Sequence, residues 1–283
     1  MNILFCTDNN IAHGVIITTL SLMESVDEPI NVYILTASIK TQTCDVKALS
    51  SDFGEYLDSV LKEKGSENFA RLYDISREFN SSLPVANLET RFTPCCMLRL
   101  YADLIDDLPD KVLYLDNDTI CRGDISALYN TDIQDFELAG VLDYYGSHFF
   151  RQHFYKRDYL NSGVLLMNLD HIRKSGLFAK CRKMCCEKQM FMPDQSALNK
   201  LCTRKKFVSR DYNEQRQLRP STKIQHFTTS FRFFPYFHKV SVKPWNISQV
   251  HEILNIYEYD SLLERAGELY NEYLNTKKET SRL

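Results

Sequence analysis

The chain has 283 residues, of which 44% are hydrophobic and 25% charged, with only nine glycines and eight prolines. A folded chain of this size buries roughly three quarters of its surface, so this composition predicts a globular domain and excludes collagen-like, low-complexity and disordered classes. Thirty-four basic residues nearly balance 37 acidic ones, giving a net charge of −3, so no overall charge attracts the chain to nucleic acid.

Nine cysteines are scattered without a Cys-x-x-Cys pair. This pattern disfavours a disulfide framework or a zinc ribbon and predicts reduced thiols in a cytoplasmic protein. The segment Met1–Cys6 contains no basic residue and Asp8 follows closely, so no secretory signal is recognised. The longest uncharged apolar stretches, 11–23 and 163–169, are shorter than the roughly 20 residues of a membrane span. We therefore expect a soluble protein.

Short apolar runs alternate with longer amphipathic segments through the first two thirds of the chain, which predicts an α/β fold with crossover helices. In chain order we predict a strand at Asn2–Cys6, a helix at Ile11–Met23, a strand at Ile30–Leu35, a helix at Thr43–Lys64, strands at Ala70–Ile75, Lys111–Leu115, Glu137–Leu142 and Gly163–Asn168, helices at Leu169–Lys188 and Asp194–Cys202, and a strand at Thr222–Phe227. After Trp245 the pattern changes to a charged helical tail, with Ser248 as its predicted N-cap.

Three common enzyme motifs are absent. No two glycines are separated by a single residue, so G-x-G-x-x-G cannot occur, and neither a Walker lysine nor G-x-S-x-G is present. The apolar run 112–115 instead ends in Asp116 and Asp118, at the carboxyl end of a strand, where open α/β sheets bind ligands. Two carboxylates so close repel each other unless a cation lies between them. We interpret the pair as a divalent-metal site; the alternative is a solvated turn.

Six segments, one of which contains this pair, follow one another along the chain. They are Asn2–Asn10, Arg99–Ala102, Leu113–Asp118, Asn161–Asn168, Asp194–Asn199, and His226 followed by Lys243–Trp245. Together they resemble glycosyltransferase family 8, the retaining enzymes of the GT-A fold that include bacterial lipopolysaccharide galactosyl- and glucosyltransferases and glycogenin. The resemblance covers residues 1–246 as a catalytic domain with a mixed, mostly parallel sheet flanked by helices, and leaves 247–283 as a helical tail.

The resemblance implies a metal-dependent transfer of galactose or glucose from a UDP-hexose, with retention, to a glycan or glycolipid acceptor in bacterial cell-surface polysaccharide or lipopolysaccharide synthesis. Asp116, Asp118 and a histidine of a late strand would hold Mn²⁺, or Mg²⁺ in its place. His226 fits this role, and His238 is its rival because an aromatic segment separates His226 from the Lys-Pro-Trp motif that usually follows within a few residues. Lys243 is expected to contact the diphosphate.

The resemblance also assigns donor-binding residues. In similar enzymes the loop after the first strand holds uracil and ribose, which assigns Asp8, Asn10 and Ile11, although Ile11 stands where an aromatic residue would stack on the base. The segment 7–10 is expected to cap the following helix as well. The other donor-binding candidates are Arg99, Asn117, Asp143 and Asn161.

Asp194 and Gln195 are the catalytic candidates that the resemblance implies, and acidic residues also favour the first turn of a helix. The family position on the β face of the sugar is Gln195, and an amide is a poor nucleophile. Front-face attack is therefore favoured over a double displacement through a covalent intermediate.

Several alternatives stay open at this level. The aromatic and basic segment 231–245 could line an acceptor groove or rest on the inner face of a membrane, or the C-terminal helices could simply pack on the domain. Two other functions compete with glycosyl transfer to a separate acceptor: a UDP-sugar-binding module with weak catalysis, and a glycogenin-like enzyme that glucosylates itself. The oligomeric state is not predicted.

Overall fold

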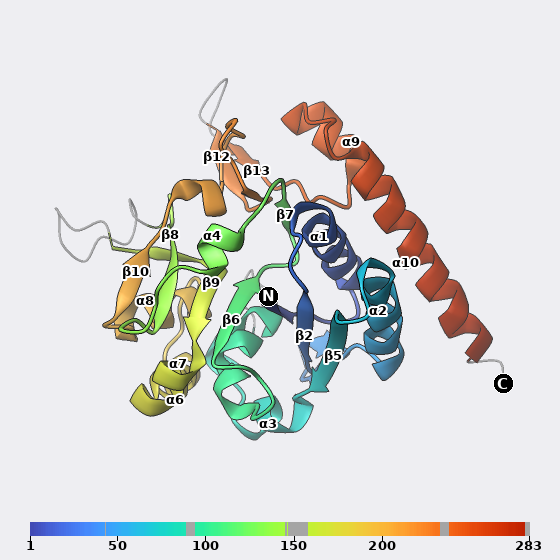
Figure 1. Cartoon of the computed structure of the whole chain (residues 1–283). Helices are drawn as coiled ribbons and strands as arrows, with labels where there is room; N and C mark the ends of the chain where they lie inside the picture. The colour runs from blue at the N-terminus through green and yellow to red at the C-terminus, as the bar shows by residue number, and fades with distance from the viewer. Residues whose placement is uncertain (43, 89–93, 145, 147–157, 233–237, 281–283) are drawn as a thin grey trace.

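A seven-stranded sheet forms the centre of the molecule, in the order β10-β8-β9-β6-β1-β2-β5 (Figure 1). The computed structural model describes residues 1–42, 44–88, 94–144, 146, 158–232 and 238–280. The strands of the sheet are β1 (Asn2–Cys6), β2 (Asn31–Thr36), β5 (Phe69–Asp74), β6 (Lys111–Leu115), β8 (Leu138–Leu142), β9 (Leu160–Asn168) and β10 (Lys205–Phe207). β9 runs antiparallel to both of its neighbours, and the other neighbouring pairs are parallel. The prediction of a mixed, mostly parallel α/β sheet is confirmed.

Helices cover both faces of this sheet. Successive side chains of a strand point to opposite faces, and both faces are apolar, so each face is buried under helices. In β1, Ile3 and Phe5 belong to one hydrophobic cluster and Leu4 and Cys6 to the other. The helices over the first face are α1 (Ala12–Ser25), α2 (Ser51–Lys64) and α10 (Asp260–Thr280). Those over the second are α3 (Ser76–Ser81), the 3-10 helix η2 (Pro94–Leu104), α6 (Leu169–Ser175), α7 (Leu177–Glu187) and α8 (Pro193–Leu201).

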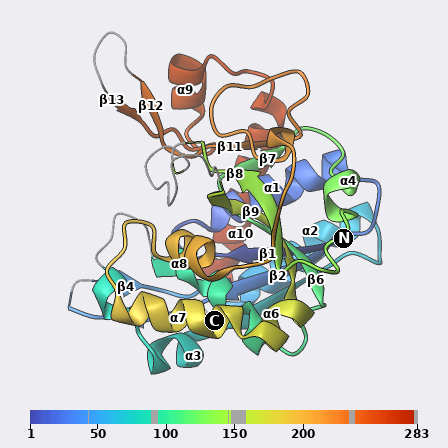
Figure 2. The same ribbon diagram turned by 90° about the vertical axis from the view of Figure 1, so that its left-hand side faces the viewer.

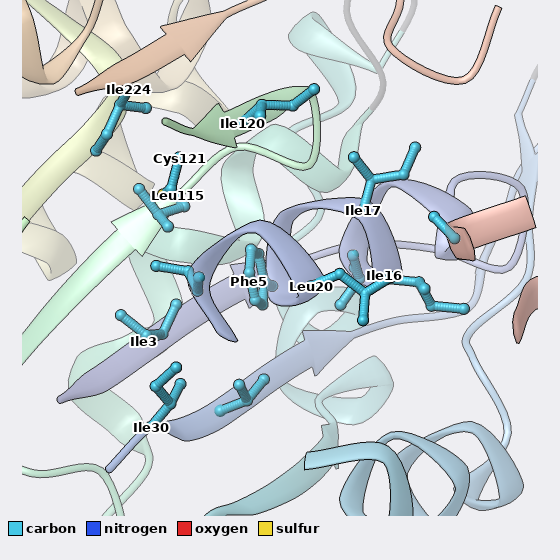
Figure 3. Packing of buried hydrophobic residues seen from close by; sticks show 14 of the residues in the cluster. Ile3, Phe5, Ile16, Ile17, Leu20, Ile30, Leu115, Ile120, Cys121 and Ile224 are labelled. Atoms are coloured by element: carbon cyan, nitrogen blue, oxygen red, sulfur yellow. The ribbon is translucent and has the colours of Figure 1, made fainter. Parts of the chain in front are cut away.

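The figures show these layers. Figure 2 shows α6, α7 and α8 together on one side of the sheet, and Figure 3 shows Phe5 of β1 close to Leu20 of α1, with Ile3 and Ile16 in the same cluster.

Among the residues that the structure describes, three two-stranded sheets accompany the central sheet. β3 (Ile39–Lys40) pairs with β4 (Asp45–Val46), β7 (Thr119–Cys121) with β11 (Ile224–His226), and β12 (Ser230–Arg232) with β13 (His238–Val240). The remaining short elements are α4 (Ser126–Tyr129), α9 (Ile247–Gln249), the 3-10 helices η1 (Val85–Asn87) and η3 (Arg210–Tyr212), and the π-helix η4 (Val250–Leu254). The pairing of β7 with β11 is antiparallel and sets His226 opposite Thr119, directly after Asp118.

The C-terminal helix α10 packs against α1 and α2 (Figure 1). Its buried side chains Leu262, Leu263, Leu269 and Tyr273 belong to the same hydrophobic cluster as Ile3 of β1. This packing supports the interpretation that the C-terminal helices cover the domain. Within the described residues no helix is both long and apolar enough to cross a membrane. The domain boundary after residue 246 stays a prediction.

Three details of the predicted helices are wrong. The helix expected from residue 43 begins only at Ser51, because residues 45–46 pair with β3 as strand β4; residue 43 lies outside the described part. The helix expected at 169–188 is divided into α6 and α7 by Gly176, whose φ of 66° is left-handed. Ser248 lies inside α9, and Asn246 is the cap, since its side chain accepts a hydrogen bond from the backbone N–H of Gln249.

Candidate active site

The structure brings together the three residues predicted as metal ligands. Asp116 and Asp118 follow β6, and His226 is the last residue of β11. Nε2 of His226 lies 3.2 Å from Oδ1 of Asp118 and 3.5 Å from Oδ2 of Asp116. One ligand atom from each of the three residues lies within 4.8 Å of the others. The rival His238 begins β13, and its side chain lies outside the described part of the structure.

The donor set and the space around it fit a divalent cation. Two carboxylates and one imidazole are ligands that Mn²⁺ accepts. The backbone of Gly163 comes so close that a Cβ there would lie 2.2 Å from Cε1 of His226 and 2.7 Å from Oδ2 of Asp116. Glycine at this position keeps the space between the carboxylate and the imidazole clear. The described residues can therefore hold a metal ion here.

The charges of the site are strongly coupled. Nζ of Lys243 donates to Oδ2 of Asp118 and lies 3.2 Å from the carbonyl oxygen of Phe227. Burial alone raises the pKa of Asp118, but Lys243 and His226 outweigh it and hold this pKa well below its usual range. Burial lowers the pKa of His226, but Asp118 and Asp116 outweigh it and raise that pKa above its usual value. The Asp118 carboxylate is thus held in its ionised form, as metal binding requires.

Arg99 connects the cluster of Asp116, Asp118 and His226 to the catalytic candidates. It lies in η2 and is 2% exposed. Its Nη2 donates to Oδ1 of Asp116 at 2.9 Å, and its Nε lies 3.3 Å from Oδ2 of Asp194. Its guanidinium lies over the ring of Tyr114, 4.0 Å from the centroid, and the Tyr114 hydroxyl donates to Oδ1 of Asp116 at 2.6 Å. Asp116 is therefore held through Oδ1, and its Oδ2 faces His226.

Asp194 and Gln195 lie in the first turn of α8, as predicted, and both are buried. Oε1 of Gln195 accepts the backbone N–H of Ser162 at 2.9 Å, and its Nε2 donates to Oδ2 of Asp143 at 3.0 Å. Oδ2 of Asp194 accepts the Ser162 hydroxyl at 3.2 Å, and the Arg99 guanidinium also donates to the Ser162 carbonyl. The catalytic candidates are thus fixed to β9 and to the end of β8.

Asn161 continues this network towards the metal cluster. Its Nδ2 donates to Oδ2 of Asp143 at 2.8 Å, and its Oδ1 accepts from Nδ2 of Asn213 at 2.9 Å. Oδ1 of Asn213 in turn lies 3.0 Å from Nδ1 of His226. Asn213 was not predicted from the sequence as a site residue, and neither were Tyr114 and Ser162. Tyr114 belongs to an apolar strand and Asn213 to a polar loop, and no spacing in the sequence singles them out.

The loop after β1 is held by contacts of its own residue Asp8. Asp8 is buried; its Oδ1 accepts the backbone N–H of Asn10 at 2.7 Å, and the Cys95 thiol donates to its Oδ2 at 3.4 Å. Asn10 is exposed and Ile11 half-buried. The expectation that this loop caps the next helix is wrong, because α1 begins after Ile11 without a side-chain cap. The Asp8 carboxylate thus accepts a hydrogen bond within its own loop and does not cap α1.

Asn117 joins the loop after β6 to the end of β1. Its Nδ2 donates to the Cys6 carbonyl at 3.0 Å. Its Oδ1 is buried and has no hydrogen-bond partner among the described residues. An unpaired buried acceptor is costly, so this oxygen is suited to accept a hydrogen bond from a ligand.

The sequence matches the model of Glycosyl transferase family 8 over residues 2–248. The chain belongs to this family. A relative from Haemophilus influenzae is 26% identical over 225 residues, which are 75% of this chain and 63% of that protein. The lipopolysaccharide glucosyltransferase WaaO of Escherichia coli is 29% identical over 158 residues, which are 51% of this chain and 47% of that protein. This chain thus spans less than two thirds of the length of these relatives.

Solved structures show the same fold. The galactosyltransferase LgtC in complex with donor and acceptor sugar analogues has a TM-score of 0.63 and 22% identity, with 95% of this chain and 96% of that chain covered. An active-site mutant of LgtC has a TM-score of 0.65, also at 22% identity, with 96% of each chain covered. The family 8 chain described here therefore has the GT-A fold that its sequence predicts.

Proposed function

We propose that this family 8 enzyme transfers galactose or glucose from a UDP-sugar to a glycan acceptor, in a metal-dependent reaction that retains the α configuration. The observation that carries the proposal is the cluster of Asp116, Asp118 and His226 in a chain that belongs to the family. WaaO is a lipopolysaccharide glucosyltransferase, and LgtC has been seen with donor and acceptor sugar analogues. These relatives support an acceptor in bacterial cell-surface polysaccharide or lipopolysaccharide synthesis.

We propose the following roles for the donor-binding residues. Asp116, Asp118 and His226 would hold Mn²⁺, or Mg²⁺, which supplies Lewis-acid stabilisation of the departing diphosphate when it is bound. The loop with Asp8, Asn10 and Ile11 would contact uridine, and the unpaired Oδ1 of Asn117 offers an acceptor beside it. Arg99, Asp143 and Asn161 would position the hexose.

Lys243 is the cation that we propose to contact the diphosphate. Its side chain is one third exposed, whereas the side chains of Asp118 and His226 are 14% and 5% exposed. It can therefore leave Asp118 and contact a phosphate oxygen without a change in the backbone. Negative charge that develops on the β-phosphate would be stabilised by this ammonium group.

The environment of Gln195 and Asp194 favours front-face attack. Both ends of the Gln195 amide are engaged in hydrogen bonds, and Asp194 is paired with Arg99 and the Ser162 hydroxyl. Because of these contacts, neither the Gln195 amide nor the Asp194 carboxylate is available to attack the sugar as a nucleophile. In a front-face reaction the bond from the acceptor oxygen to the anomeric carbon forms on the side where the bond to the phosphate oxygen breaks. That phosphate oxygen keeps the electron pair of the broken bond and takes the acceptor's proton. Loss of transfer in Asp194→Asn with intact UDP binding would give Asp194 a chemical role instead.

The cellular setting is also part of the proposal. All nine cysteines are free thiols, which is compatible with the reducing cytoplasm, where we place the enzyme. We keep residues 247–283 as a helical extension of the catalytic domain. Contact of segment 231–245 with the inner face of the membrane is tested by cosedimentation with anionic vesicles at low salt, where protein that stays in the supernatant excludes it.

The decisive experiment is UDP release from a panel of UDP-sugars, with Mn²⁺ or with a chelator, for the wild type and Asp118→Asn. Metal-dependent release from one donor, lost in the variant, would establish the reaction and identify the sugar. If no donor is turned over, calorimetric titration with UDP and Mn²⁺ separates the cases. Binding without turnover indicates a missing acceptor or a nucleotide-binding module, and absence of binding refutes the proposed site.

A further inference from the structure

We propose that Asn213 is a positioning residue for the metal site: it fixes which ring nitrogen of His226 carries a hydrogen and so presents the other nitrogen to the cation. The inference rests on the proposed function and extends it to a residue outside the ligand set. Asn213 directly follows η3 and is fully buried, and its Oδ1 lies 3.0 Å from Nδ1 of His226.

The side-chain amide of Asn161 has only one orientation that fits its neighbours. Its Nδ2 lies 2.8 Å from the carboxylate of Asp143, and an ionised carboxylate can only accept hydrogen bonds. Its Oδ1 lies 2.9 Å from the backbone nitrogen of Gly163, which can only donate. The two contacts agree: the NH₂ group faces Asp143 and the oxygen faces Gly163.

The orientation of Asn161 determines that of Asn213. Because the oxygen of Asn161 also lies 2.9 Å from Nδ2 of Asn213, that nitrogen is the donor and Oδ1 of Asn213 is the group that faces His226. An amide oxygen only accepts, so Nδ1 of His226 carries a hydrogen. Nε2 is then the nitrogen with a lone pair in the neutral ring, and it is the one that faces Asp116 and Asp118.

Burial makes this chain of hydrogen bonds effective. Asp143, Asn161, Asn213 and His226 are each at most 6% exposed, so water does not compete readily for their polar groups. Without the Asn213 oxygen, the Nδ1 hydrogen of His226 would be buried and unpaired. The ring could then place its hydrogen on Nε2, beside the two carboxylates, where it would block the metal. Hydrogen-bond partners of this kind orient metal-binding histidines and typically contribute 10–100-fold to metal affinity.

The test is the Mn²⁺ affinity of the full chain in the presence of UDP, measured by calorimetry. Leu is close to Asn in shape but accepts no hydrogen bond, so we expect Asn213→Leu to weaken Mn²⁺ binding by about 10–100-fold. In a His226→Gln background the same substitution is expected to change the affinity by no more than about twofold, because the residue through which it acts is gone. A purely structural role of Asn213 would give the same loss in both backgrounds.

The matched control is Asn87→Leu. Asn87 is also fully buried and bonded, donating to the Lys188 carbonyl at 2.7 Å and accepting the N–H of Met190 at 2.8 Å, but it lies in η1, outside the network of His226. It should leave the Mn²⁺ affinity unchanged. If Asn213→Leu does not fold, Asn213→Ala takes its place in the same cycle.

The outcomes separate the inference from the proposed function. A wild type that binds Mn²⁺ with UDP, while the Asn213 variant behaves like Asn87→Leu or loses affinity equally without His226, overturns the inference alone. A wild type that binds no Mn²⁺ with UDP overturns the proposed function and the inference with it.

Discussion

Substitution of Gly163 by alanine is expected to disable the site without unfolding the protein. Gly163 lies in strand β9, where the extended backbone accepts any side chain, so the effect comes from the added methyl group alone. Ordinary contacts begin at 3.4 Å, whereas this Cβ would lie 2.2 Å from Cε1 of His226, so the ring has to retreat by about 1.2 Å. Asp116, 2.7 Å from the same Cβ, is held by Arg99 and cannot give way freely.

A misplacement of about 1 Å in a reacting group can cost about 100-fold in rate, or about 2.7 kcal/mol of transition-state stabilisation. We therefore expect Gly163→Ala to lower kcat/KM for UDP release by about 100-fold and to weaken Mn²⁺ binding in parallel. The overpacked site also costs about 1–3 kcal/mol of the free energy of unfolding, which leaves the protein folded.

Gly267→Ala is the matched control, since a Cβ at this exposed position of α10 meets no atom within 4 Å. It should retain full activity and gain up to about 1 kcal/mol in stability from helix propensity. Urea unfolding and UDP release are measured on all three proteins. Wild-type turnover and Mn²⁺ affinity in Gly163→Ala would refute the steric reasoning.

Three further predictions concern protons, charge and the tail. Because the pKa of His226 is raised and the metal must displace its proton, Mn²⁺ affinity should fall by about tenfold for each pH unit below that pKa, as calorimetry at several pH values would show. Arg99→Ala leaves the carboxylates of Asp116 and Asp194 without their buried partner, and we expect urea unfolding to show a loss of about 3–5 kcal/mol. A chain that ends before Asp260 lacks four large buried side chains of α10, each contributing about 1.5–3 kcal/mol, so circular dichroism should show it largely unfolded.

Each of these predictions has an outcome that contradicts it. The pH dependence should disappear in His226→Gln; if the variant keeps it, another group titrates. An Arg99→Ala protein as stable as the wild type would mean that water replaces the guanidinium. A truncated chain with a cooperative, wild-type-like melting transition would show that α10 is an appendage, as the sequence alone led us to expect.

The sheet could be predicted because each strand is recognised from its own short stretch of sequence. Alternate residues of β1 and β6 are apolar on both faces, and a strand that ends in Asp116 and Asp118 places carboxylates at the edge where ligands bind. The division between α6 and α7 was missed because a single residue decides it. Gly176 interrupts an otherwise helical pattern by its left-handed conformation, which the apolar spacing does not record.

The sequence could not show which histidine lies beside the two carboxylates, because this depends on contacts between distant segments. His226 reaches the carboxylates because β11 pairs with β7, more than 100 residues earlier in the chain. Asn213 is likewise brought to the site by contacts with residues that are distant in the sequence. Its neighbours Asn161 and His226 are 52 and 13 residues away, and only the folded chain makes them adjacent.

Each carboxylate of the proposed metal site has a cationic partner before any ligand binds, and this has a consequence for ligand binding. Arg99 pairs with Asp116, and Lys243 pairs with Asp118. Under the proposed function, a cation that binds Asp118 competes with Lys243 for Oδ2, while a diphosphate draws Lys243 away and adds ligand oxygens of its own. Each ligand thus removes an obstacle to the other, and by linkage the coupling is reciprocal: UDP should tighten Mn²⁺ binding by the same factor by which Mn²⁺ tightens UDP binding. The ion pair between Lys243 and Asp118 therefore favours capture of metal and nucleotide together over capture of either alone.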